Sequence, residues 1–159
     1  TAIQFDRYLA RADGQLNTFS HGRKVVGINA RSSKRLNRDT LYSVAIVDIS
    51  QGASVILPDM GDRYMSVQVV NEEGFTNKLF HGAGRHELSL KEFHTDYVWL
   101  LVRTLVVDSV PDDLQAAHKF PEGVRFSGPI ARHLMNQSTW HQSTNTLRQG
   151  FRPLPEWSQ

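Results

Sequence analysis

Hydrophobic and polar positions follow a short period along the middle of the chain. Segment 63–71 alternates, with apolar side chains at 65, 67 and 69 on one face and polar or aromatic side chains at 64, 66 and 68 on the other. This period of two predicts a strand with one buried face. Segments 41–49 and 97–107 are apolar at both parities, which predicts strands buried on both faces. The other expected strands are 25–28, 53–57, 75–81 and 85–90.

Turn residues separate these segments. Segment 57–62 combines proline, glycine and two aspartates, a composition typical of a turn. Strands that recur at a spacing of about ten residues predict an all-β fold, here a jelly-roll-like β-sandwich. Two short flanking helices are expected, at about 3–13 and at about 112–119 behind Pro111.

The chain changes character after Phe120. Segment 121–159 is rich in Gly, Pro, Ser, Thr, Asn and Gln, with scattered aromatic residues that include Trp140 and Trp157. We therefore expect a β-sandwich domain over 1–120 and a polar, extended arm over 121–159. Aromatic anchors on the arm and open sheet edges predict a homo-oligomer.

Composition narrows the class of protein without naming a function. The 159 residues are 40% hydrophobic and carry a net charge of +2, which is ordinary for one globular domain. Zero cysteines exclude disulfides and thiolate metal sites and fit either redox compartment. The run 97–107 contains Arg103 and is shorter than the about 18 residues that span a bilayer. The helix over 3–13 lacks an N-cap, so we expect the natural protein to begin upstream, and the sequence assigns no compartment.

A set of short motifs carries a family resemblance. The motifs are Asn37-Arg38-Asp39-Thr40-Leu41-Tyr42-Ser43, Asp48, Leu57-Pro58-Asp59, Gly61-Asp62-Arg63-Tyr64, Gln68, Asn71, Gly84-Arg85 and Leu100-Leu101-Val102-Arg103-Thr104. Over about residues 15–120 the chain resembles the family of domain of unknown function 1254 (DUF1254), whose members are mostly bacterial. The resemblance implies a jelly-roll-like sandwich, frequently oligomeric, with no established reaction. Members often carry a second, C-terminal domain, which is not evident here.

Arg103 interrupts an apolar strand, so we expect its guanidinium to be partly buried and to need a carboxylate. Asp39, Asp48 and Asp59 are the candidates. One interpretation is a structural ion pair with Asp39 that fixes the loop 37–40 against the sheet. The other is a clamp for an anion or a substrate carboxylate.

The clamp interpretation predicts a ligand-binding pocket, for a small anionic or polyhydroxylated ligand, carbohydrates included. Arginine forks and tyrosine hydroxyls at strand ends are suited to such ligands. The expected lining residues are Arg38, Asp39, Tyr42, Tyr64, Arg85 and Arg103.

Other chemistries have weaker support in the sequence. His81, His86 and His94 lack the spacing of a metal site, and we predict none. A triad of Ser43, His81 and Asp39 would lack the usual nucleophile motif. The segment 82–84 is too short for a nucleotide loop, so no cofactor is expected. The basic segment 23–38 has few aromatic neighbours, and we predict no nucleic-acid partner.

The sequence therefore predicts a binding or assembly module, and it does not decide whether the protein is an enzyme. The alternative is a hydrolase-like or lyase-like enzyme acting on a small polar or carbohydrate substrate. Asp39 sealed against Arg103 would favour the module, whereas Asp39 in an open pocket would favour the enzyme.

Overall fold

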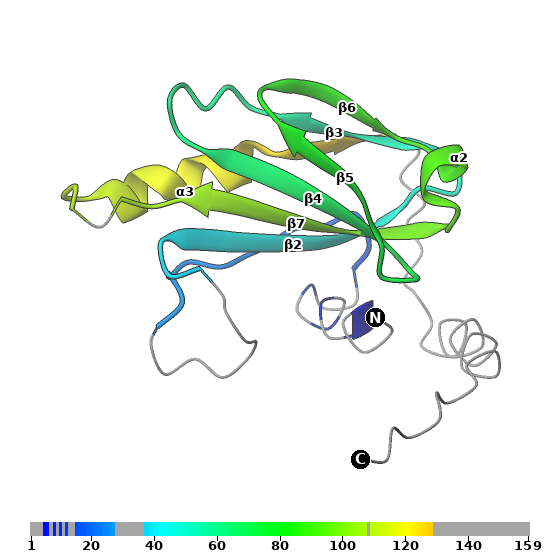
Figure 1. Ribbon diagram of the computed structural model, residues 1–159, viewed down its shortest axis with the longest axis horizontal. Helices are drawn as coiled ribbons and strands as arrows, with labels where there is room; N and C mark the ends of the chain where they lie inside the picture. The colour runs from blue at the N-terminus through cyan, green and yellow to red at the C-terminus, as the bar shows by residue number, and fades with distance from the viewer. Residues whose placement is uncertain are drawn as a thin grey trace, which may run out of the picture.

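The computed structural model describes residues 5, 6, 8, 10, 12, 15–27, 37–107 and 109–128. They form two antiparallel sheets that face each other (Figure 1). The larger sheet has the order β1-β2-β7-β4-β5 and the smaller sheet has the order β6-β3-β8. The strands are β1 (Ser20–His21), β2 (Thr40–Asp48), β3 (Ala53–Leu57), β4 (Met65–Asn71), β5 (Thr76–His81), β6 (Gly84–Leu88), β7 (Tyr97–Leu105) and β8 (Arg125–Ser127). The prediction of an all-β sandwich is confirmed.

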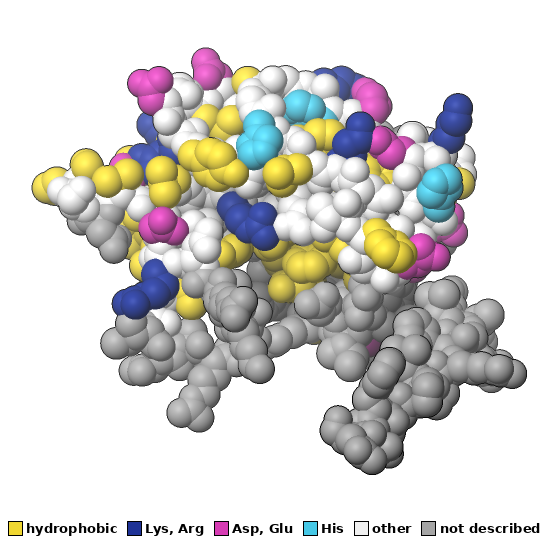
Figure 2. Space-filling model, in the orientation of Figure 1, with side chains coloured by type: hydrophobic (Ala, Val, Ile, Leu, Met, Phe, Trp, Pro, Cys, Tyr) yellow, Lys and Arg dark blue, Asp and Glu magenta, His cyan; other side chains and the backbone are white. Residues whose placement is uncertain are grey.

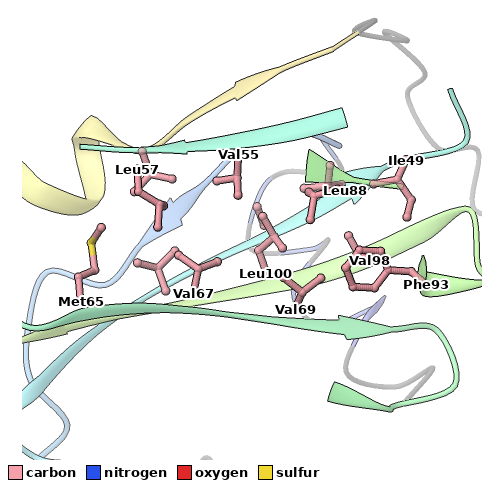
Figure 3. Close-up of a cluster of buried hydrophobic side chains, with 14 of the residues drawn as sticks. Ile49, Val55, Leu57, Met65, Val67, Val69, Leu88, Phe93, Val98 and Leu100 are labelled. Atoms are coloured by element: carbon pink, nitrogen blue, oxygen red, sulfur yellow. The ribbon is translucent and has the colours of Figure 1, made fainter. Parts of the chain in front are cut away.

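The main core lies between the two sheets. Aliphatic side chains of β2, β4 and β7 meet those of β3 and β6 there (Figure 3). Val55, Val67 and Leu100 are each 0% exposed. Because side chains alternate along a strand, this packing fixes which positions point inward and which point to the outer face of the larger sheet.

The outer face of the larger sheet is also partly covered. Phe5, Tyr8 and Leu16 of the N-terminal segment pack on Val44, Leu101 and other side chains of β2, β4 and β7. Figure 1 shows the described residues of the N-terminal segment, in dark blue, on the side of this sheet away from β3 and β6. This second contact explains why β2 and β7 are apolar at both parities.

Two short helices flank the strands. Helix α2 (Leu90–Phe93) joins β6 to β7 and begins at the last residue of the strand expected over 85–90. Helix α3 (Asp113–Gly123) is the helix expected over 112–119, extended through Pro121. Of the expected N-terminal helix, residues 5, 6, 8 and 10 are described and are helical. No helix in the described part of the chain is long and apolar enough to cross a membrane.

The structure differs from the sequence prediction at two boundaries. Residues 25–27 form no strand, and the short strand at this edge is β1 instead. The sandwich also continues past residue 120, since β8 pairs with β3 and Val124 is buried in the main core. Residues 121–128, which were expected to begin the arm, thus belong to the sandwich. The rest of the predicted arm, 129–159 with Trp140 and Trp157, lies outside the described residues.

Candidate functional site

One row of side chains crosses four strands on the outer face of the larger sheet. Strand register places Tyr42 of β2 opposite Arg103 of β7, Arg103 opposite Ser66 of β4, and Ser66 opposite His81 of β5. All four have the parity of outer-face residues such as Leu101. We call these four residues the polar row. In Figure 2 a basic side chain lies near histidine and hydrophobic side chains on the face in view.

Arg103 is partly buried and is held by a neutral group. Its Nη2 donates to Gln68 Oε1 at 2.7 Å. The Nε2 of the same amide donates to Thr76 Oγ1 at 2.7 Å. This chain of two hydrogen bonds orients the guanidinium through neutral groups.

No described carboxylate pairs with Arg103. The ion pairs among the described residues are Arg23–Glu122, Arg63–Asp113, Lys78–Glu92 and Arg85–Glu87. The expected pair with Asp39 is therefore wrong. The register explains the error. Tyr42 lies opposite Arg103, whereas Asp39 precedes Tyr42 by three residues and lies before the start of β2.

The other two carboxylates proposed for Arg103 are engaged locally. Asp48 Oδ1 accepts hydrogen bonds from the main-chain N–H and the hydroxyl of Ser50, at 2.9 and 2.6 Å. Asp59 Oδ1 accepts from the Gly61 N–H at 3.0 Å. Both carboxylates therefore stabilise turns.

The loop that leads into β2 is held by its own motif residues. The Tyr42 hydroxyl accepts a hydrogen bond from the Asn37 N–H at 2.9 Å. Asp39 accepts from the Thr40 hydroxyl at 2.9 Å through its side chain, and from the Val106 N–H at 2.7 Å through its carbonyl. Arg38 and Asp39 are exposed. This part of the family motif therefore shapes the start of a strand.

Arg63 forms an internal ion pair and serves as a comparison for Arg103. It donates to both carboxylate oxygens of Asp113 and, at 2.6 Å, to the Leu105 carbonyl. The hydrogen bonds from Arg63, helped by one from the Val107 N–H, lower the pKa of Asp113 to about 2. Arg63 is thus neutralised by a carboxylate, whereas Arg103 is not.

Tyr64 lies at the margin of the polar row. Its carbonyl accepts from the Leu105 N–H at 3.0 Å, which places it diagonally from Arg103 on the same face. Its side chain is 52% exposed, and its ring lies 5.6 Å from that of His81, tilted by 50°. The structure therefore brings Tyr42, Tyr64 and Arg103 together.

Arg85 is separated from these residues. It lies on β6 opposite Ile56, on the face of the smaller sheet that points away from the main core. Its Nε donates to Glu87 Oε1 at 2.7 Å and its Nη1 to Ser127 Oγ at 3.3 Å. The two sheets and the core between them thus separate Arg85 from Arg103, and the common site predicted for the two does not form.

The structure adds two residues to the site, Gln68 and Ser66, which the sequence analysis did not place among the expected lining residues. Gln68 orients Arg103, as described above. Ser66 is 1% exposed, and its hydroxyl has no hydrogen-bond partner among the described residues. The alternation within segment 63–71 was the available signal, since it places Ser66 and Gln68 on the same face as Tyr64.

Neither a catalytic triad nor a metal site forms among the described residues. Ser43 faces the inner side of the sheet, and its hydroxyl lies 2.9 Å from Nδ1 of His21. Burial, with a smaller effect from Arg23, lowers the pKa of His21. His81 lies on the outer face, so it cannot reach Ser43. No group of three or more metal-ligating side chains is present in the described ranges.

The fold and the polar row define an antiparallel β-sandwich domain with a candidate binding face. Residues 16–87 match the family described as a protein of unknown function (DUF1254). This match confirms the family resemblance of the sequence motifs. No curated protein is significantly similar in sequence to the chain.

A solved structure has a similar fold. It is the crystal structure of the VPA0106 protein from Vibrio parahaemolyticus, with a TM-score of 0.61 and 17% sequence identity. The match covers 91% of this chain and 42% of that protein, so the chain spans about two fifths of its length. At this identity the likeness concerns the fold alone.

Proposed function

We propose that this domain is a binding module for a small anionic or polyhydroxylated ligand, which it takes on the outer face of the larger sheet. Arg103 supplies the charged donor, and Tyr42, Ser66 and Tyr64 surround it. The observation that supports this proposal is the partly buried guanidinium held by Gln68 without a described carboxylate. A guanidinium forms stronger, charge-assisted hydrogen bonds with an anion than with a neutral amide.

The geometry also favours preorganisation. Thr76 holds the Gln68 amide, and the amide holds Arg103. A donor that is already oriented loses little entropy when a ligand binds. Arg38 and Asp39, at the exposed loop before β2, lie beyond the row and are assigned no contact with the ligand.

Thermal-shift measurements with sugar acids, carboxylates, phosphate and neutral sugars test this proposal. At ten times its Kd, a ligand should stabilise the fold by about 1.4 kcal/mol, which is about 3–6 °C for a domain of this size. Arg103→Met should abolish the shift. The matched control is Arg85→Met, which removes the same charge from the smaller sheet and should keep it.

Two results would contradict the proposal. In the first, no anion in the panel shifts the melting temperature of the parent protein. In the second, Arg103→Met and Arg85→Met respond to the ligand alike.

An enzyme of the hydrolase or lyase type remains the second candidate, and His81 is the observation that favours it. His81 lies in the polar row and is exposed, so it is placed where a proton acceptor would be needed beside an anionic substrate. Asp39 does not decide between module and enzyme. It is exposed and thus not paired with Arg103, but it also lies away from Arg103 and so does not line the proposed site. If turnover of a bound ligand is found, His81→Gln should abolish it and retain binding.

We also infer that the chain forms a homo-oligomer, as the family resemblance implies. The support in the structure is β5, an edge strand of the described sheet, where Leu79 is 49% exposed and neighbouring Phe75 is 65% exposed. Open edges and exposed apolar side chains are typical of association surfaces. Light scattering should give a mass that is a multiple of 18.0 kDa, and Leu79→Lys should lower it. A mass of 18.0 kDa at all concentrations would contradict the inference.

A further inference from the structure

We propose that the ligand of the polar row is a uronic acid, a sugar ring that carries one carboxylate. This inference rests on the proposed function and names its ligand class. The single described guanidinium of the row lies beside an exposed aromatic ring, that of Tyr64.

Arg103 has donors left for a carboxylate. A guanidinium carries five N–H donors in a planar fork, and the described contacts of Arg103 use Nη2 alone. The fork matches the two oxygens of a carboxylate. Because Gln68 fixes the plane of the guanidinium, it also fixes the direction from which the carboxylate approaches.

Tyr64 supplies a surface for the sugar ring. Half of its side chain is exposed, at 52%, and the tilted contact with His81 supports the ring. Aromatic rings present an apolar face with a polar hydroxyl at the edge, which suits the mixed apolar and polar surface of a pyranose. Diagonal neighbours on one face of an antiparallel pair lie about 7–8 Å apart, so one sugar could contact Tyr64 with its ring and Arg103 with its carboxylate.

The charge of the row favours a singly charged ligand over phosphate. Arg103 is the one described lysine or arginine in the row, and the row includes no helix N-terminus among the described elements. Sites for phosphate usually combine several donors of charge or main-chain N–H groups at a helix start. A carboxylate on a sugar needs one guanidinium and a stacking surface, which is what the described residues provide.

The test is a chemical-shift titration of the ¹⁵N-labelled chain with four probes: glucuronate, glucose, acetate and inorganic phosphate. Glucuronate carries both the ring and the carboxylate, so its affinity should be at least about tenfold higher than that of glucose, acetate or phosphate. Tyr64→Ala should weaken glucuronate about tenfold and leave acetate unchanged. Tyr64→Phe, which retains the ring and loses only the hydroxyl, should keep most of the affinity that Tyr64→Ala loses. Phe75→Ala, which removes an exposed ring elsewhere, should bind as the parent does.

The outcomes separate this inference from the proposed function. If acetate or phosphate binds as tightly as glucuronate, or if Tyr64→Ala has no effect, the uronic acid assignment is overturned while anion binding at Arg103 stands. If no anion binds, or if Arg103→Met binds glucuronate as the parent does, both are overturned.

Discussion

Asn71 offers the sharpest test of how the family motif residues act on the fold. The residue ends β4 and is 2% exposed. Its Nδ2 donates to the Phe93 carbonyl of α2 at 3.2 Å, and its Oδ1 accepts from the Phe75 N–H at 2.9 Å. The side chain thus ties the turn before β5 to α2, and Asn71→Leu removes both hydrogen bonds while it keeps a similar volume.

The cost follows from the burial of the two partners. Phe93 is 0% exposed, and a buried carbonyl left without a donor costs about 1–3 kcal/mol. The Phe75 N–H lies in an exposed turn, so the loss of its bond costs about 0.5–1.5 kcal/mol. The sum predicts a destabilisation of roughly 2–4 kcal/mol for Asn71→Leu.

Urea unfolding measures this difference. With a slope of about 1–3 kcal/mol/M, the midpoint of Asn71→Leu should fall by roughly 1–2 M. The matched control is Asn77→Leu, an exposed position on β5, which should stay within about 0.5 kcal/mol of the parent. A loss below about 1 kcal/mol for Asn71→Leu would refute the structural role assigned to this side chain.

Three further predictions concern charged groups. Because Arg63 lowers the pKa of Asp113 to about 2, this carboxylate stabilises the fold above its ordinary pKa, and the contribution is lost as the pH falls from about 4 towards 2; urea midpoints of Asp113→Asn should lack that acid dependence. Burial lowers the pKa of His21, so its contribution is present above about pH 6.5 and is lost as the pH falls below it; His21→Gln should flatten the urea midpoints between pH 7.5 and 5.5, and unchanged curves would contradict this. Asp39→Ala should destabilise the fold by less than about 1 kcal/mol, since Asp39 is exposed. A loss of unfolding free energy above about 3 kcal/mol in urea would instead support the buried ion pair with Arg103.

Local pattern was sufficient for the three long strands of the larger sheet. The alternation within segment 63–71 and the apolar runs at 41–49 and 97–107 are set by period and burial, which are properties of single segments. They predicted β4, β2 and β7 correctly. What covers the outer face could not be predicted, because the packing of Phe5 on these strands joins distant parts of the chain.

The partners of the charged residues depended on strand pairing. Arg103 was expected to meet a carboxylate, but the register places Tyr42 and Ser66 beside it and leaves Asp39 outside the strand. Arg85 was grouped with Arg103 because both are arginines of expected strands, yet their strands belong to different sheets. Register and sheet membership are properties of pairs of strands and do not follow from either segment alone.

The side-chain NMR resonance of Arg103 Nε–Hε gives the most direct test of the central claim, that this guanidinium binds an anionic ligand. The resonance is assigned by its loss in Arg103→Met, and glucuronate or another sugar acid is then added to the parent protein. We expect a saturable shift of this resonance, with the Nε–Hε resonance of Arg85 unchanged. No shift at Arg103 at saturating ligand, or equal shifts at Arg103 and Arg85, would contradict it.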